Sequence, residues 1–273
     1  MAIAHDRGET VPDSVRGGWL QDARRSLDVL LSLAYADLRA RYGRGPTRLV
    51  KWLLDPYAAL GIYLLLVALI LDLEGPAPGL SIACAVVAFQ LVMMTILNSL
   101  SSIRQRASIL LNMGFPRTLI PLSSAMTESI AFASSLSLLA LMMAAYGVAP
   151  TTAVLWFPLV LGVNALFAVA CAYPLTLVGS WYEEMRPFVV SLMRAMFFLA
   201  PALVPLSQIT GTVSDLIKLN PLTGLFEGYR DALLYGQAPA AWELLYPFGV
   251  SVALLIAFVP LFRREQRHLA KMI

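Results

Sequence analysis

The sequence predicts an all-α integral membrane protein with six transmembrane helices, an N-terminal amphipathic interface helix and short outer helices between spans five and six. Hydrophobic residues make up 59% of the 273 residues and charged residues 14%, and the mean hydropathy is +0.72. A soluble domain carries about 25% charged residues. No Asp, Glu, Lys or Arg occurs in residues 75–103, 129–182 or 244–262. The second gap is longer than one crossing of a hydrocarbon layer about 30 Å thick, so the chain must fold back within the bilayer.

Residues 1–54 are expected to form a cytoplasmic segment that contains an amphipathic helix. Six apolar residues share one helical face: Leu27, Leu30, Leu31, Ala34, Leu38 and Tyr42. Most charged residues lie off this face, so the helix is expected at the membrane surface with its arginines near anionic headgroups. It is either a lipid anchor or a docking surface for a partner subunit. The long charged stretch before the first span does not fit a cleavable signal peptide.

Six apolar stretches within a transmembrane domain of residues 55–262 are long enough to cross the bilayer: 56–73, 80–98, 118–146, 153–180, 188–206 and 243–262. Basic residues mark the second-to-third and fourth-to-fifth connections: Arg104, Arg106, Arg117, Arg186 and Arg194. The other two short connections carry none. The positive-inside rule therefore places both termini, including the tail at 263–273, in the cytoplasm.

The connection between spans two and three is expected to hold a second amphipathic helix. Its apolar residues share one face: Ile103, Ala107, Leu110 and Leu111. Gly114 and Pro116 suit the end of a helix and a turn. The segment is either a solvated connector or a helix that transmits motion from a partner.

Residues 207–241 form the longest connection on the outer side. Asn220 and Pro221 suit the N-cap and first position of a helix, and an apolar face continues to Leu233. Charged residues occupy the other faces. Mixed apolar and charged residues so close to the bilayer predict a re-entrant or interfacial helix pair.

The composition excludes several kinds of chemistry. Both histidines, His5 and His268, lie outside the apolar segments, so no metal site or His-based catalytic pair is expected there. None of the three lysines follows glycine, so the phosphate-binding loop of a nucleotide site is absent. Cys84 and Cys171 are expected to be packing residues. The chain is therefore expected to have no cofactor and no enzymatic activity, and any ATP-driven work requires another chain.

Glu128 is the one carboxylate clearly within a predicted span. It is either a proton or substrate site, or a buried polar contact at a helix or subunit interface. Aromatic residues near span ends are ordinarily interface residues. Alternatively, some line a pore and stack on sugar rings.

Several stretches resemble the membrane subunit of bacterial ATP-binding cassette exporters of polysaccharides and lipid-linked glycans, the type-2 permease family. The resemblance rests on four segments in matching order: residues 37–42, 52–56, 115–121 and 220–230. Together with six spans, it covers the chain from about residue 25. It implies a homodimer that binds two ATPase subunits on the cytoplasmic side, and these subunits bind ATP and magnesium.

The resemblance also implies roles for particular residues. The first and fifth spans would line a channel, with these candidates: Tyr57, Tyr63, Phe197 and Phe198. Coupling to the ATPase would involve the 104–114 helix and the interface helix: Arg104, Arg106, Leu110, Leu111, Asp37, Arg39 and Arg41. An outer gate would include Asn220, Pro221, Phe226, Tyr229 and Arg230.

The expected function is export of a polysaccharide or lipid-linked glycan, such as O-antigen, capsule or teichoic acid, across a bacterial inner membrane. The expected partners are the ATPase, a second copy, the glycan and membrane lipid, and no nucleic acid. Two alternatives remain open. In the first, the same fold carries a drug or lipid, and in the second, the chain is a proton-coupled carrier that uses Glu128.

Overall fold

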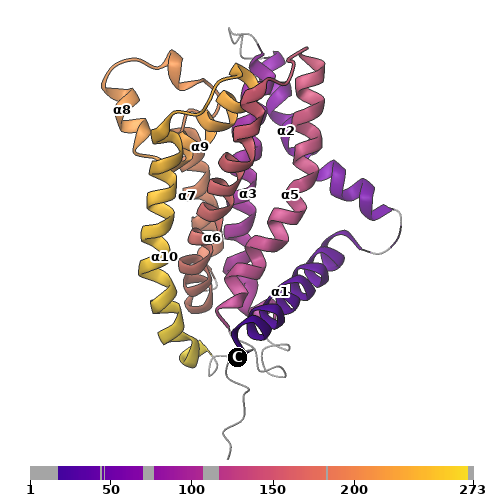
Figure 1. Ribbon diagram of the computed structural model, residues 1–273, viewed down its shortest axis with the longest axis vertical. Coiled ribbons are helices and arrows are strands. Elements are labelled where there is room, and N and C mark those ends of the chain that lie inside the picture. Colours follow the sequence, from indigo (N-terminus) through magenta and orange to yellow (C-terminus); the bar gives the residue numbers. More distant parts are fainter. Residues whose placement is uncertain are drawn as a thin grey trace, which may run out of the picture.

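The computed structural model describes residues 18–69 apart from 44 and 46, residues 77–106, and residues 117–269 apart from 183. Within these ranges every regular element is helical (Figure 1). The prediction of an all-α protein is confirmed for this part of the chain.

The helices follow one another as α1 (Gly18–Tyr42), α2 (Thr47–Leu69), α3 (Pro78–Gln105), α5 (Leu119–Ala145), α6 (Phe157–Trp181), α7 (Met185–Leu199), α8 (Thr212–Lys218), α9 (Pro221–Arg230) and α10 (Ala241–Leu269). Short 3-10 turns precede α6 and α8: η1 (Thr152–Trp156) and η2 (Leu206–Gln208). A π turn, η3 (Asp231–Tyr235), continues α9.

Four described segments are long and apolar enough to cross a membrane: Pro78–Gln105, Leu119–Ala145, Thr152–Trp181 and Ala241–Glu265. They correspond to the second, third, fourth and sixth predicted spans. The helix α2 corresponds to the first predicted span, whose last residues lie outside the described part of the chain.

The fifth predicted span differs from the structure. A helix was expected over residues 188–206, but α7 ends at Leu199. Ala200 precedes Pro201 and has an extended backbone, with φ −82° and ψ 155°, because a residue before proline is disfavoured in the helical region. The 15 residues of α7 span about 22 Å, which is less than the hydrocarbon thickness.

The central helix is α3, which contacts α5, α6 and α9. Every residue from Gly79 to Ala88 is buried, so protein surrounds this part of the helix on all sides. Many of these residues are small, which lets neighbouring helices approach closely. Cys84 is one of them and is unpaired, as expected of a packing residue.

The chain reverses direction between α1 and α2. Gly43 and Gly45 adopt φ values of +80° and +102°, which only glycine reaches without strain. As a result α1 lies across the lower end of the bundle (Figure 1) and packs against α5. The face that packs differs slightly from the predicted one, because Leu33 is buried whereas Leu27 and Leu31 are exposed.

Candidate functional site

The lower end of the bundle holds four charged side chains that join three helices. We call them the α1 cluster: Asp37, Arg41, Arg106 and Glu128. Asp37 of α1 forms an ion pair with Arg106, which follows the end of α3. Asp37 also accepts a hydrogen bond from Thr127 of α5 at 3.2 Å. Arg106 is 4% exposed and donates to the carbonyl oxygen of Ile120 at 3.3 Å.

One turn further along α1, Arg41 meets Glu128 of α5. Nη1 of Arg41 lies 3.0 Å from both carboxylate oxygens of Glu128, and Asn98 of α3 also donates to this carboxylate. Glu128 is 3% exposed, so burial of its charge requires such a partner. Of the two interpretations of Glu128, this geometry favours the polar contact between helices.

Two aromatic residues of α2 also bind to α5. The indole nitrogen of Trp52 donates to the carbonyl oxygen of Ala131 at 2.9 Å. The hydroxyl groups of Tyr57 and Ser137 are hydrogen-bonded at 3.2 Å. Tyr57, a predicted channel residue, is thus half-buried against α5, while the side chain of Tyr63 lies outside the described part of the structure.

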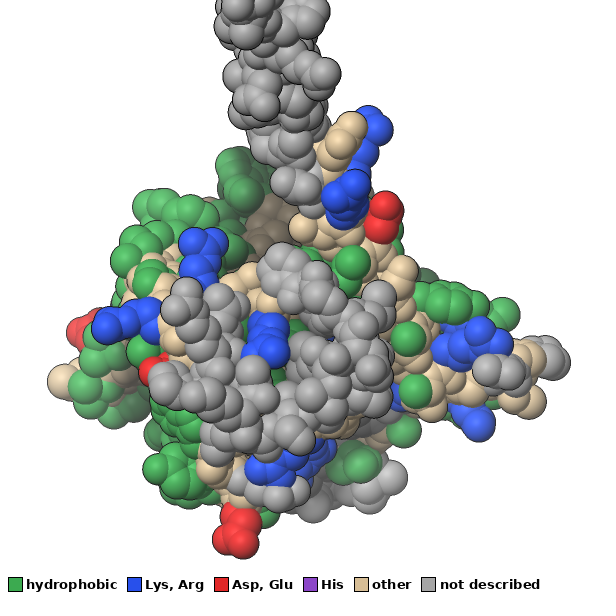
Figure 2. Space-filling view, turned by 90° about the horizontal axis from the view of Figure 1, so that it is seen from below, with side chains coloured by type: hydrophobic (Ala, Val, Ile, Leu, Met, Phe, Trp, Pro, Cys, Tyr) green, Lys and Arg blue, Asp and Glu red, His purple; other side chains and the backbone are tan. Residues whose placement is uncertain are grey.

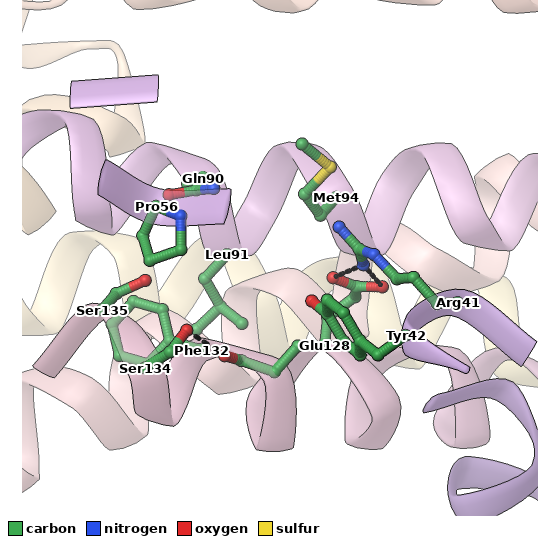
Figure 3. Close-up of a pocket in the computed structure, with 11 residues that line it drawn as sticks. Arg41, Tyr42, Pro56, Gln90, Leu91, Met94, Glu128, Phe132, Ser134 and Ser135 are labelled. Atoms are coloured by element: carbon green, nitrogen blue, oxygen red, sulfur yellow. Dashed lines mark hydrogen bonds and ion pairs between the residues drawn. The ribbon is translucent and has the colours of Figure 1, made fainter. Parts of the chain in front are cut away.

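A small cavity lies between α1, α2, α3 and α5. Arg41 and Glu128 face each other in its wall, with Gln90 and Pro56 farther along it (Figure 3). Its volume is about 20 Å³, which is room for about one water molecule. A sugar ring does not fit, so this cavity of the single chain is not a glycan site.

The predicted coupling residues therefore have different environments. Arg39 and Arg104 are exposed, on α1 and in the last turn of α3. Arg106 is buried by its contacts with Asp37 and α5, so little of it faces outward. Leu110 and Leu111 lie outside the described residues.

At the upper end, α9 begins as the sequence predicts. The side chain of Asn220 accepts a hydrogen bond from the backbone of Leu222 at 3.1 Å, and Pro221 is the first helical residue. The Asn220 amide also donates to the carbonyl oxygen of Met196 at 2.7 Å. This capping residue therefore connects α9 to α7.

A second buried charge group lies on α9, and we call Glu227 and Arg230 the α9 cluster. Arg230 has no exposed surface and donates to Glu227 at 2.7 Å. It also donates to three backbone carbonyl oxygens, those of Pro201 at 2.7 Å, Ala202 at 2.8 Å and Ser81 at 3.3 Å. Glu227 accepts from the backbone of Leu206 at 3.0 Å. The cluster thus connects α9, the start of α3 and the irregular segment after α7.

The remaining predicted gate residues are also internal. Phe226 and Tyr229 have no exposed surface. Tyr229 receives a hydrogen bond from Asn164 of α6 at 3.0 Å, and the ring of Phe226 lies 5.9 Å from that of Phe197. Sequence periodicity identified the apolar face of α9 and missed the burial of its charged face. The spacing of Glu227 and Arg230, three residues apart, was the signal for their pairing.

The two phenylalanines of α7 differ in environment. Phe197 is 1% exposed and packs on Phe89 at a ring distance of 4.7 Å. Phe198 is 63% exposed. In this conformation Phe197 belongs to the core of the chain, and Phe198 presents its ring outward.

Comparison with known proteins gives consistent results. Residues 36–234, which contain both clusters, match the family described as ABC-2 type transporter. The chain is 28% identical over 248 residues to the O-antigen export system permease protein RfbA of Myxococcus xanthus, covering 90% of this chain and 95% of that protein. A protein of the same name from Klebsiella pneumoniae is 23% identical over 248 residues, with the same coverage of both chains.

Proposed function

Because the chain belongs to the ABC-2 type transporter family, we propose that it is the permease subunit of an exporter that moves an O-antigen-type polysaccharide or lipid-linked glycan across the bacterial inner membrane. The observation that carries the proposal is the similarity to O-antigen export permeases over 95% of the length of two of them. The sequence lacks a phosphate-binding loop, which supports an energy source on another chain.

The proposed topology has six crossings with both termini in the cytoplasm. In it α2 and α7 supply the first and fifth crossings, and the segment after α7 completes the fifth. The end of the molecule that lies at the bottom of Figure 1 then faces the cytoplasm. The several basic side chains at this end (Figure 2) fit this orientation.

The proposed channel lies between two copies of the chain. The helix α7 has an outward apolar face that the single chain does not cover: Phe188, Leu192, Phe198 and Leu199, exposed by 61%, 49%, 63% and 66%. A second copy would cover part of this face, and aromatic rings left in the channel would stack on sugar rings. Tyr57, Tyr63 and Phe198 are the candidates for that role.

The proposed partner is a pair of ATPase subunits, which bind ATP and magnesium and dock at the lower end. Exposed Arg39 and Arg104 would contact them directly, together with Leu110 and Leu111. Arg106 would act indirectly, because its ion pair with Asp37 links the end of α3 to α1. Movement of the segment after α3 would then move α1 as well.

Reconstitution tests this function. The chain would be purified with its ATPase in proteoliposomes that contain lipid-linked O-antigen, and glycan reaching the opposite leaflet would be measured with a membrane-impermeant lectin. We expect translocation that requires ATP and is lost when the nucleotide site of the ATPase is inactivated.

Three results would contradict the proposal. Export of a drug or lipid without glycan export would favour the alternative cargo. Transport by this chain alone, driven by a proton gradient and lost in the Glu128→Gln variant, would favour the proton-coupled carrier. Glycan translocation without ATP would remove the role of the ATPase.

A further inference from the structure

A second cavity lies at the lower end, away from the α1 cluster. It is lined by Leu100, Ser101, Arg104, Gly179, Tyr182 and Arg186. These residues come from the last turns of α3 and α6 and the first turn of α7. The volume is about 250 Å³, several times the 30 Å³ or so that a water molecule occupies in the liquid.

Gly179 brings the ends of α3 and α6 together beside this cavity. A Cβ atom on Gly179 would overlap the carbonyl oxygen of Leu100, so only glycine allows this approach of the two backbones. The close crossing sets Arg104, four residues after Leu100, near Tyr182, three residues after Gly179. The close crossing of α3 and α6 at Gly179 therefore brings the lining residues of the cavity together.

The lining has the chemistry of an anion site. Two guanidinium groups, of Arg104 and Arg186, line the same cavity, and Arg186 donates to the hydroxyl of Ser101 at 3.2 Å. Tyr182 adds a phenol. Arginine binds phosphate oxygens in a bidentate geometry.

The described residues near the cavity carry charges of both signs, because Glu184, the residue before α7, lies two residues from Arg186. Viewed from below, this end of the molecule shows several basic side chains and few acidic ones (Figure 2).

The position of the cavity indicates a lipid headgroup. Trp181 and Tyr182 are 42% and 63% exposed at the end of α6. Exposed Trp and Tyr at the end of a span are typical of the membrane–water interface. The cavity lies between the ends of α3 and α6, which are both candidate spans, so the proposed orientation places it near the cytoplasmic surface of the membrane.

We propose that this cavity binds the phosphate or diphosphate of a lipid headgroup, with Arg104 and Arg186 as its ligands. The chemistry is shared by an anionic phospholipid and by the phosphate linker of a lipid-linked glycan. This proposal rests on the proposed function for the orientation of the chain in the membrane, in which the lower end of the molecule faces the cytoplasm. In that orientation the site lies at the start of α7, where it would hold the head of a lipid-linked substrate beside the proposed channel.

The test measures lipid binding to the full chain in nanodiscs of phosphatidylcholine by native mass spectrometry. The probes are dioleoyl phosphatidic acid, geranylgeranyl diphosphate and geranylgeraniol, which carries no phosphate. In the Arg104→Gln/Arg186→Gln variant we expect about tenfold weaker binding of both phosphate-bearing probes and unchanged binding of geranylgeraniol. A larger effect on the diphosphate would identify the glycan carrier as the source, and equal effects would identify a phospholipid.

The matched control is Arg263→Gln/Arg264→Gln, which removes two exposed arginines from the end of α10. It changes net charge equally, and its affinities should stay within about twofold of those of the unchanged chain. Equal losses in both double variants would overturn the proposal, because binding would then reflect surface charge alone. Unchanged binding in Arg104→Gln/Arg186→Gln would also overturn it.

Two further measurements complete the test. If the glutamine variant does not fold, Arg104→Lys/Arg186→Lys keeps the charge without the bidentate geometry, and about threefold weaker diphosphate binding is expected. Arg104 is also a proposed ATPase contact, so loss of ATPase binding in Arg104→Gln/Arg186→Gln is compatible with the lipid site only if lipid affinity falls as well. Loss of ATPase binding with unchanged lipid affinity would show that the two arginines serve the ATPase alone, and the proposal would be wrong. The binding assay needs neither ATPase nor glycan, so its failure is distinct from failure of glycan export.

Discussion

Arg230 at the upper end and Arg106 at the lower end are both almost completely buried, but their partners differ in kind. Arg230 pairs with Glu227 three residues away and with three backbone carbonyl groups. Arg106 pairs with Asp37, 69 residues away, and the neighbouring Arg41 pairs with Glu128, 87 residues away. The α9 cluster thus stabilises one local region, whereas the α1 cluster joins helices that are distant in sequence.

The two clusters also differ in access to water. The side chains of the α9 cluster are 0% and 8% exposed. In the α1 cluster, Asp37 and Arg41 are 34% and 31% exposed while their partners are buried. Water replaces an exposed ionic partner at much lower cost than a buried one. The comparison indicates a rigid upper end and an α1 that separates from α5 more easily.

The largest effect is expected from breaking the α9 cluster. In Arg230→Gln, Glu227 keeps a buried charge without its cation, and three carbonyl groups lose a charged donor. We expect a loss of about 3–5 kcal/mol, measured as thermal unfolding in detergent or as loss of folded protein. The double variant Glu227→Gln/Arg230→Gln should recover part of this loss, because the unpaired charge is gone. Unchanged stability of the Arg230→Gln variant would show that the α9 cluster does not stabilise the upper end.

An intermediate effect is expected from the α1 cluster. A double-mutant cycle with Arg41→Gln and Glu128→Gln should give a coupling energy of about 1–2 kcal/mol in detergent unfolding, because Arg41 is partly hydrated. The exposed Arg39, two residues before Arg41, provides the control, and Arg39→Gln should change stability by less than about 0.5 kcal/mol. A coupling energy as large as the loss in Arg230→Gln would contradict the proposed difference between the two ends.

The smallest effect concerns pH at the upper end. Burial, together with the nearby Glu227 carboxylate, raises the pKa of Asp231 in η3. An acid with a raised folded-state pKa binds its proton more tightly in the folded state, so stability falls as pH rises from its unfolded pKa through its folded pKa. Asp231→Asn keeps a side-chain acceptor for Gln237, which donates to Asp231 at 2.8 Å.

Melting temperatures measured between pH 4 and pH 8 would check this prediction. We expect Asp231→Asn to be more stable than the unchanged chain at the upper end of this range, by up to about 1 kcal/mol. The control Asp215→Asn changes an exposed carboxylate on α8 and should leave the pH dependence intact. A steeper fall of stability with pH in Asp231→Asn would contradict the assignment.

Helix boundaries were predicted best where local chemistry sets them. Asn220 and Pro221 start α9, and Tyr42 ends α1 just before a glycine with positive φ. The fifth predicted span was too long, because its apolar residues continue past Leu199 while Pro201 ends the helix. Hydropathy records the preference for the bilayer, and backbone geometry decides where a helix stops.

The charged contacts were predicted least well. The sequence showed Glu128 as the one carboxylate clearly within a predicted span and did not identify a partner for it. Its partner Arg41 reaches it because the chain reverses after Tyr42 and places α1 against α5. Arg230 was predicted to lie off the apolar face of α9, in an outer gate, but the segment after α7 and the start of α3 cover it.

The sequence by itself determined that this protein lies in a lipid bilayer, that it is helical, and roughly where its apolar segments lie. These follow from the transfer free energy of each stretch, which depends on composition over about 20 residues. Only the tertiary structure decided which charges meet and which helix ends enclose a cavity. Chain reversal at Gly43 brings together charged residues that are 69 and 87 positions apart in the sequence. The close crossing at Gly179 brings the ends of α3 and α6 together.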